Sequence, residues 1–197
     1  MHIPDLILAL LLGIGLSAST GLNTFLPLLL LSAAARFHIA DITLNAKFGW
    51  LASDLAIGIL IAACIIEIVA DKVPAVDHVL DSVGTFLRPA AGLVAVSSVL
   101  TGVDPVIAAV VGLIVGSPIS FGIHSLKAGT RVASTATTFG CANPFISMIE
   151  DVLALLLSVA SILAPILVPL ALLLVAWLLW RAARSISARG ASERSGP

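Results

Sequence analysis

Long apolar runs fill most of this chain and are separated by short polar stretches. The runs extend over Ile3 to Phe37, Trp50 to Ala70, Leu87 to Leu100, Val106 to Ile119 and Phe145 to Trp180. A transmembrane helix needs roughly 20 apolar residues, so a chain of 197 residues has room for about six to eight crossings once loops are subtracted. The pattern therefore predicts an all-α protein, a polytopic transmembrane helical bundle.

Two of the runs contain small residues and prolines that weaken a helix. The candidate breaks are Ser19, Gly21 and Pro27 in the first run and Gly116, Pro118 and Gly122 in a later one. We expect a few residues around each position to be non-helical inside the bilayer, as in broken or re-entrant helices. The alternative is that Gly and Ser only allow close packing of helices. Pro165 and Pro169 should split or kink the last run.

The two candidate breaks can be superposed by sliding the chain on itself. Gly15 then meets Gly116, and Ser19 meets Ser120. This indicates an inverted internal repeat with halves of about 6–100 and 105–181, on the pattern of transporters built from two such halves. Interrupted helices at corresponding positions of two halves are typical of a transport site, because they expose helix ends at mid-membrane. In a composition this biased, chance matches are an alternative explanation.

Composition excludes several classes of protein. Hydrophobic residues make up 59% of the chain, charged residues only 11%, and the mean hydropathy is +1.16. A soluble domain could not bury that much apolar surface, so residues 1–181 are expected to form one membrane domain in contact with the lipid bilayer. The net charge of −1 and the scattered basic residues exclude nucleic-acid binding.

The C-terminal segment is basic. Four arginines follow the last apolar run or lie within the tail, namely Arg181, Arg184, Arg189 and Arg194. The positive-inside rule then predicts a cytoplasmic C-terminus, with the multi-pass domain in a bacterial inner (plasma) membrane. Residues 182–197 are rich in Ser and Gly and are expected to be a disordered tail.

Ionisable residues near the middle of the chain are candidates for a cation-binding or proton-transfer site. Glu67, Asp71, His78 and Asp81 would share a narrow face if they lay on one continuous helix, although Pro74 interrupts it. Such a set would suit a divalent cation or a proton relay. The plainer interpretation is an interfacial helix whose acids are solvated or paired with Lys72 and Arg88.

A second group of charges follows the later candidate break. His124, Lys127 and Arg131 are spaced by about one helical turn, and Glu150 and Asp151 are the next acids along the chain. Unpaired charges in a bilayer cost at least a few kcal/mol each, so we predict that Lys127 or Arg131 pairs with Glu150 or Asp151. Otherwise the two basic side chains extend to the water interface.

Signatures of catalysis are missing from the sequence. There is no GxSxG, no HExxH and no phosphate-binding glycine-rich loop, so we expect no enzyme activity and no cofactor. The two cysteines, Cys64 and Cys141, lack the close spacing of zinc or iron–sulfur ligands.

Three stretches carry a resemblance to a known family. They are SASTGLNTFLPLLLLSAAARF, EIVADKVPAVDHVLDSVGTFLRPAAG and GSPISFGIHSLKAGTRVASTATTFGCANPFISMIED. Over about Leu6 to Leu167 the chain resembles a bacterial membrane family catalogued as domain of unknown function 4126. The resemblance implies a polytopic membrane fold and carries no substrate.

Two functional interpretations follow. The first is a small transporter or channel-like protein, compatible with a homodimer, that moves an ion or small polar solute along a pathway lined by Asn23, Glu67, Asp71, His124, Lys127, Arg131, Glu150 and Asp151. The second is a non-transporting membrane scaffold or accessory subunit, whose polar residues fix helix packing. The depth of the charges discriminates between them: charges around a shared polar cavity favour transport, and charges at the two interfaces favour a scaffold.

Overall fold

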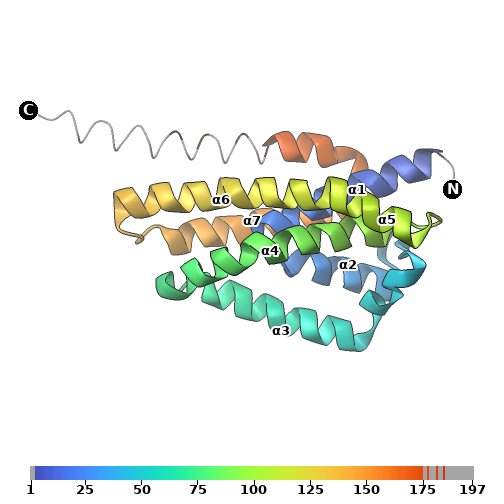
Figure 1. The fold of residues 1–197 in the computed structure, drawn as a ribbon, viewed down its shortest axis with the longest axis horizontal. Coiled ribbons are helices and arrows are strands. Elements are labelled where there is room, and N and C mark those ends of the chain that lie inside the picture. Colours follow the sequence, from blue (N-terminus) through green and yellow to red (C-terminus); the bar gives the residue numbers. More distant parts are fainter. Residues whose placement is uncertain (1–2, 175–176, 178–180, 182–183, 185–197) are drawn as a thin grey trace, which may run out of the picture.

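The computed structural model describes residues 3–174, 177, 181 and 184, apart from the side chains at positions 74, 75, 77 and 78. Within these residues it has helices and no strands, which confirms the predicted all-α class. The α-helices are α1 (Ile3–Leu22), α2 (Leu26–Arg36), α3 (Asp54–Ala70), α4 (Pro74–Val99), α5 (Pro105–Val111), α6 (Ser117–Thr138) and α7 (Asn143–Leu163). Short helical segments are η1 (Ile39–Asp41), η2 (Ala46–Ala52), η3 (Gly112–Gly116) and η4 (Pro165–Leu167). The helices lie roughly along one long axis (Figure 1).

Four helical segments are long and apolar enough to cross a membrane, which indicates a multi-pass membrane protein. They are Ile3–Leu22, Val79–Val99, Pro105–Thr138 and Asn143–Leu163, and the bent pair of η2 and α3 would make a fifth. The predicted six to eight crossings are not confirmed. The main reason is that α2 and the segment Pro165–Leu174 are helical but too short to span.

Helix α4 differs from the expected interfacial segment at Asp71 to Pro89. It runs unbroken through Pro89, and its apolar half continues to Val99. Pro89 has no N–H to donate to the carbonyl of Thr85, so α4 lacks one of its own hydrogen bonds at this point. Two hydroxyls of α6 bond α4 next to the proline: Ser117 Oγ donates to Pro89 O at 2.9 Å, and Ser120 Oγ donates to Arg88 O at 2.7 Å. Packing against α6 therefore stabilises a helix that the isolated segment would not favour.

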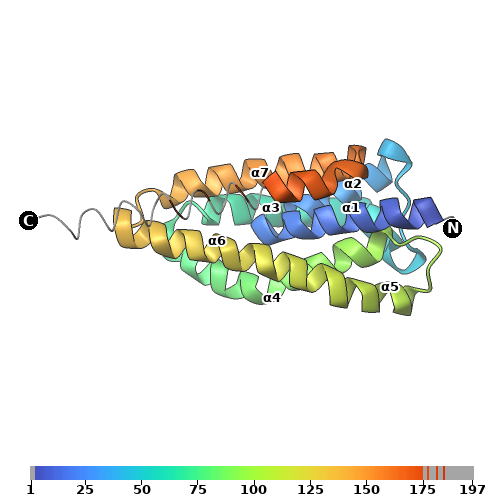
Figure 2. The ribbon, with the colours of Figure 1, turned by 90° about the horizontal axis from the view of Figure 1, so that it is seen from above.

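The first apolar run folds back on itself in the interior. Helix α1 enters from the N-terminal end and stops midway along the molecule, and α2 returns toward the same end (Figures 1 and 2). The break lies at residues 23–25, so the predicted loss of helix at Ser19 and Gly21 is wrong by a few residues: both lie within α1. Pro27 occupies the first turn of α2, where its missing N–H removes no helical hydrogen bond.

The later candidate break is not a break. Pro118 and Gly122 lie within α6, and Gly116 ends the π-helical segment η3, which joins α5 to α6. The resulting helix, Pro105–Thr138, has 34 residues and a length of about 51 Å, well beyond the roughly 30 Å of bilayer hydrocarbon. The last run does split, because the helix ends at Leu163 and resumes at Pro165.

Glycines let the central helices touch at their backbones. A Cβ on Gly92 would lie 2.6 Å from the carbonyl oxygen of Gly116, and one on Gly21 would lie 2.5 Å from that of Ser120. Thr20 Oγ1 donates to Ser120 Oγ at 2.9 Å in the same region. The two stretches matched in the proposed repeat thus face each other across α1 and α6. The inverted repeat itself is not confirmed, since one stretch ends a helix and the other continues one.

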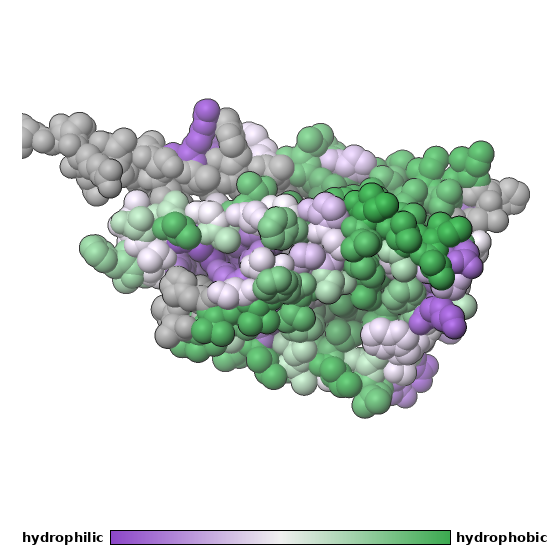
Figure 3. Space-filling view, viewed as in Figure 1, coloured by the Kyte–Doolittle hydropathy of each residue, from purple (hydrophilic) through white to green (hydrophobic). Residues whose placement is uncertain are grey.

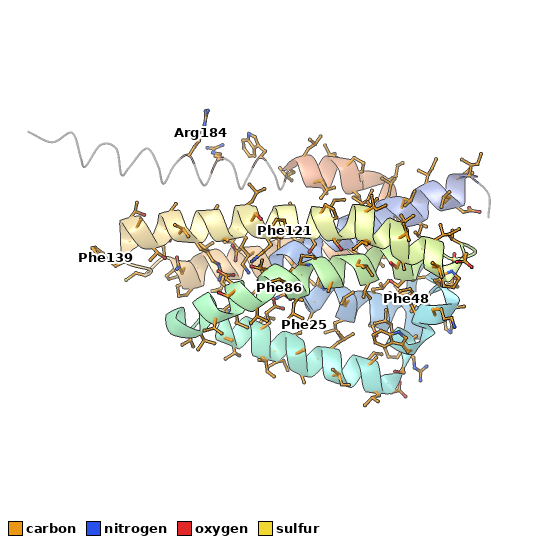
Figure 4. All side chains as sticks on the ribbon, viewed as in Figure 1. Phe25, Phe48, Phe86, Phe121, Phe139 and Arg184 are labelled. Atoms are coloured by element: carbon orange, nitrogen blue, oxygen red, sulfur yellow. The ribbon has the colours of Figure 1, made fainter. Side chains whose placement is uncertain are left out.

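The outer surface of the bundle is largely apolar (Figure 3). Helix α3 shows this most clearly, with Leu55 at 74% and Ile66 at 65% exposure. Phe86 and Phe121, labelled in Figure 4, are also exposed. Polar residues are instead buried in stripes at helical spacing, which on α6 comprise Ser120, His124, Lys127, Arg131 and Ser134. An apolar exterior around a polar interior is the pattern expected of a helix bundle in lipid.

Candidate functional site: a buried charge cluster at a helix break

The N-terminus of α2 is capped by a carboxylate from another helix. Glu67, near the end of α3, accepts hydrogen bonds from the backbone N–H of Thr24 at 2.9 Å to each oxygen. It also accepts from the Thr24 hydroxyl at 2.7 Å and from the Phe25 N–H at 3.2 Å. A negative charge at this position complements the positive end of the α2 dipole. Phe25 lies between Phe48 and Phe139, which mark the two ends of the bundle (Figure 4).

The C-terminus of α1 meets two cations. Arg88 Nη1 donates a hydrogen bond to the carbonyl oxygen of Gly21 at 3.1 Å, and Lys127 Nζ donates one to the carbonyl oxygen of Leu22 at 2.9 Å. These carbonyls belong to the last turn of α1, where a helix lacks its own donors. Both ends of the break are therefore satisfied by buried charges of the sign that each helix dipole favours.

Asn23 links the break to α7. Its Oδ1 accepts from the Leu26 N–H at 3.0 Å, and its Nδ2 donates to Asp151 Oδ1 at 3.0 Å. Lys72 pairs with the other oxygen of Asp151 at 3.3 Å. Asp151 therefore bonds the tip of the hairpin that α1 and α2 form, and it does not pair with Lys127 or Arg131 of α6.

Glu150 is the acid that pairs with α6. Arg131 Nη2 lies 2.7 Å from Glu150 Oε2, and Lys127 Nζ lies 3.3 Å from the same atom. Asp71 Oδ2 contacts the same two nitrogens, at 3.3 Å from Arg131 and 3.2 Å from Lys127. The predicted pairing of the α6 cations with an acid of α7 is confirmed.

We call these residues together the charge cluster: Glu67, Asp71, Asp81, Arg88, Lys127, Arg131 and Glu150. Arg88 joins its two parts, with Nη2 3.5 Å from Glu67 and 4.0 Å from Asp81, while Arg131 Nη1 lies 3.8 Å from Asp81. Six members are at most 4% exposed, and the side chain of Asp81 is 18% exposed. Four carboxylates against three cations give a formal charge of −1.

His124 lies between the cluster and a polar cavity. Its Nδ1 is 2.7 Å from Arg88 Nη1, which is a permanent donor, so Nδ1 accepts and the ring is neutral with its proton on Nε2. Nε2 lies 3.3 Å from Thr85 Oγ1. The cavity has a volume of about 350 Å³ and is lined by Asp81, Ser82, Thr85, His124, Ala128, Arg131 and Val132. Figure 3 shows hydrophilic side chains between α4 and α6 at this place.

The proposed metal site is not supported by this arrangement. Among the described residues, no three His, Cys, Asp or Glu side chains come together as metal ligands. Glu67, Asp71 and Asp81 each face Arg or Lys, because α3 and α4 fold into a hairpin in place of the single helix assumed from their spacing. The side chain of His78, the fourth candidate ligand, lies outside the described residues.

Arg88 has a larger role than the sequence predicts. The sequence indicates only a pairing with acids at the interface, whereas Arg88 is 1% exposed and connects the cluster to the helix break. A signal was present, since Asp81, Thr85 and Arg88 are spaced as one face of a helix. The proline at 89 concealed it by arguing against a continuous α4.

One family model matches most of the chain. The family model described as Domain of unknown function (DUF4126) matches residues 10–185. The chain belongs to this family. The matched range contains the helix break and the whole charge cluster. No curated protein and no solved structure gives a significant match to the chain.

Proposed function

We propose that this DUF4126 protein is a small transporter that moves an ion or small polar solute past the α1–α2 break. The observation that carries the proposal is the charge cluster, which is buried at the ends of two broken helices and adjoins a polar cavity. Broken helices that present charged or polar groups in the interior are the recurring design of transporter binding sites.

Packing alone does not require such a cluster. Elsewhere the same helices are held by small residues, as at Gly92 and Gly116, at no electrostatic cost. Each charge taken out of water costs several kcal/mol before its partner compensates. Ionisable residues placed at that cost inside a membrane domain are typical of substrate and ion pathways.

The shape of the interior also favours a pathway. The polar cavity lies between the first half of α4 and the second half of α6, toward the Phe139 end. Toward the other end, α1, α4 and α6 pack tightly against one another. Their backbones touch at Gly21 and Gly92, and Ser17 Oγ donates a hydrogen bond to Gly116 O at 2.5 Å. A cavity on one side and tight packing on the other is what a transporter shows when it is open to one side.

A scaffold or accessory subunit is the second candidate. It is favoured by the completeness of the bonding at Glu67, whose carboxylate accepts hydrogen bonds from three donors and faces Arg88. In this interpretation the sole role of the cluster is to hold the α1–α2 hairpin in place. The two candidates differ in whether water and solutes reach the cluster.

For the orientation we propose that the Phe139 end faces the cytoplasm of a bacterium with the protein in its inner membrane. Support comes from the arginines of the tail and the positive-inside rule. Arg184 lies beside the half of the bundle that is nearer to Phe139 (Figure 4). Arg181 lies 5.2 Å from the centre of the Trp177 ring, and Trp side chains are enriched at membrane interfaces.

Thiol labelling tests whether the cavity belongs to a pathway. In a Cys64→Ala, Cys141→Ser background, Thr85→Cys should react with a membrane-impermeant thiol reagent from the cytoplasmic side. The matched control is Ser158→Cys, at a buried hydroxyl on α7 that bonds only to its own helix at Ala154 O; it should stay unlabelled. A folded Thr85→Cys protein that is inert from both sides would exclude the transporter proposal and favour the scaffold.

A further inference from the structure

The carboxylates of Asp71 and Glu150 have an unusual shared environment. One oxygen of each contacts the same two nitrogens, Lys127 Nζ and Arg131 Nη2. The other oxygens, Asp71 Oδ1 and Glu150 Oε1, are buried and have no hydrogen-bond partner among the described residues. The same two cations thus hold both carboxylates, and each carboxylate keeps one buried acceptor atom to spare.

Counted over the side chains that the structure describes, the charge cluster has one more negative than positive charge. Its four carboxylates face three cations, and adding the neighbouring pair of Lys72 and Asp151 leaves the sum at −1. An uncompensated buried charge is costly, and the least costly remedy for two adjacent carboxylates is to share one proton. Such a pair titrates as a unit and not as two separate residues.

Further unpartnered oxygens lead from this pair along α7. Ser147 Oγ and Asn143 Oδ1 are buried and lack partners among the described residues, and they precede Glu150 by three and seven positions. Residues at this spacing share one helix face, about 5–6 Å apart from turn to turn. They run from Glu150 toward the α6–α7 turn at the Phe139 end.

We propose that Asp71 and Glu150 form a proton-binding site, loaded through Ser147 and Asn143. This rests on the proposed function and names the coupling ion as H⁺. Loading transfers a proton from hydronium to a carboxylate oxygen, which forms an O–H bond and releases water. A proton fits better than a metal ion, because it needs only one of the two unpartnered oxygens, and among the described residues no three His, Cys, Asp or Glu side chains come together as metal ligands.

The charged groups around the pair come from four elements. Lys127 and Arg131 face it from α6, Arg88 and Asp81 complete the cluster from α4, Glu67 lies on α3, and Asp151 and Lys72 lie beside Glu150 and Asp71. Unloading leaves both carboxylates of the pair ionised, so that they attract Lys127 more strongly than the loaded pair does. Lys127 also bonds the C-terminus of α1, so the proton and the α1–α2 tip are physically connected.

Infrared spectroscopy of the purified protein tests proton binding directly. At neutral pH the wild type should show the carbonyl band of one buried protonated carboxyl group, and Glu150→Gln or Asp71→Asn should remove it. Each single variant should keep a Tm close to the wild type, because it leaves three acids against three cations. The double variant should lose stability, since two acids then face three cations.

Proteoliposomes with an internal pH dye test loading. An imposed membrane potential should drive proton uptake that falls at least tenfold in Glu150→Gln and several-fold in Ser147→Ala. Matched controls are Asp54→Asn, an exposed acid paired with Arg36, and Ser158→Ala on the same helix. Neither should change the rate.

The outcomes separate this inference from the proposed function. An absent carboxyl band, or a saturable rise of Tm with Na⁺ or K⁺ at fixed pH that requires Glu150, would overturn the proton site. A cavity still labelled at Thr85→Cys would leave transport of another solute standing. A band that depends on Asp71 and Glu150 in a protein without cavity labelling or proton uptake would instead preserve the binding site and remove transport.

Discussion

The ammonium group of Lys127 donates a hydrogen bond to the carbonyl oxygen of Leu22 at 2.9 Å, across 105 positions of the chain. The same nitrogen lies 3.2 Å from Asp71 and 3.3 Å from Glu150. One fully buried side chain thus joins the end of α1 to the acids of α3 and α7. The interior of this bundle is organised around ionic contacts to a helix break, and the predictions below test their contributions.

Removing the cap of α2 should be strongly destabilising. Glu67→Ala leaves the N–H groups of Thr24 and Phe25 without an acceptor and Arg88 with one acid fewer, which should cost about 3–5 kcal/mol. Glu67→Gln should recover part of this because its amide oxygen still accepts. Asp54→Ala, which breaks the exposed pair with Arg36, should cost at most about 1 kcal/mol. Equal losses in thermal unfolding in detergent would contradict the capping role.

Arg131 and Glu150 should show strong, asymmetric coupling. Arg131→Met leaves four acids against two cations and should lower Tm far more than Glu150→Gln, which leaves three against three. The double variant should be more stable than Arg131→Met alone, because it removes the stranded acid. A double-mutant cycle in detergent measures the coupling, and strict additivity would mean that the two charges are independent.

Backbone contact between α4 and α6 should make Gly92 intolerant of any side chain. A Cβ there would lie 2.6 Å from Gly116 O and 2.7 Å from the Ser120 Cβ, so Gly92→Ala should cost about 1–3 kcal/mol. Gly58→Ala on α3 is the matched control, since nothing lies within 4 Å of its added methyl group. It should be neutral or slightly stabilising, in line with the helix propensity of Ala. A Gly92→Ala protein with unchanged Tm would refute the close approach.

The native cysteines offer a test of topology. Cys141 is exposed in the α6–α7 turn, whereas Cys64 is buried in α3. An impermeant maleimide should modify Cys141 in inside-out membrane vesicles and not in intact spheroplasts, if the Phe139 end is cytoplasmic. Lys47→Cys in a Cys141→Ser background lies at the opposite end and should show the reverse pattern. Labelling of both from the same side would rule out the proposed arrangement.

The membrane class and several pairings are accessible from sequence for clear physical reasons. Apolar run length reflects bilayer thickness, and the cost of isolated charge in lipid is enough to predict that Arg131 or Lys127 meets an acid such as Glu150. The sequence alone does not decide between Glu150 and Asp151. Adjacent residues on a helix point about 100° apart, and only the position of α3, with Lys72, decides which acid faces α6.

The location of the helix break was beyond sequence reasoning. Gly and Ser lower helix propensity, and they also permit two helices to touch, so the same residues predict a break or a tight contact. Gly21 and Gly116 make such a tight contact between helices. The chain breaks instead at Asn23 to Phe25, where Glu67, Arg88 and Lys127 satisfy the exposed backbone. These three side chains come from helices that are distant in the sequence, and no local sequence pattern predicts their contacts with the break.

The α1–α2 hairpin has a consequence for biogenesis. Because the carbonyls at its tip bond Arg88 and Lys127, the hairpin lacks its partners until α6 has left the ribosome. We therefore expect the hairpin to reach its final depth only after α6 has been synthesised, and to need an interim host until then, such as the translocon or an insertase. Substitution of Lys127 should then first misplace α1 in the membrane, and the variant protein should be degraded by membrane quality-control proteases.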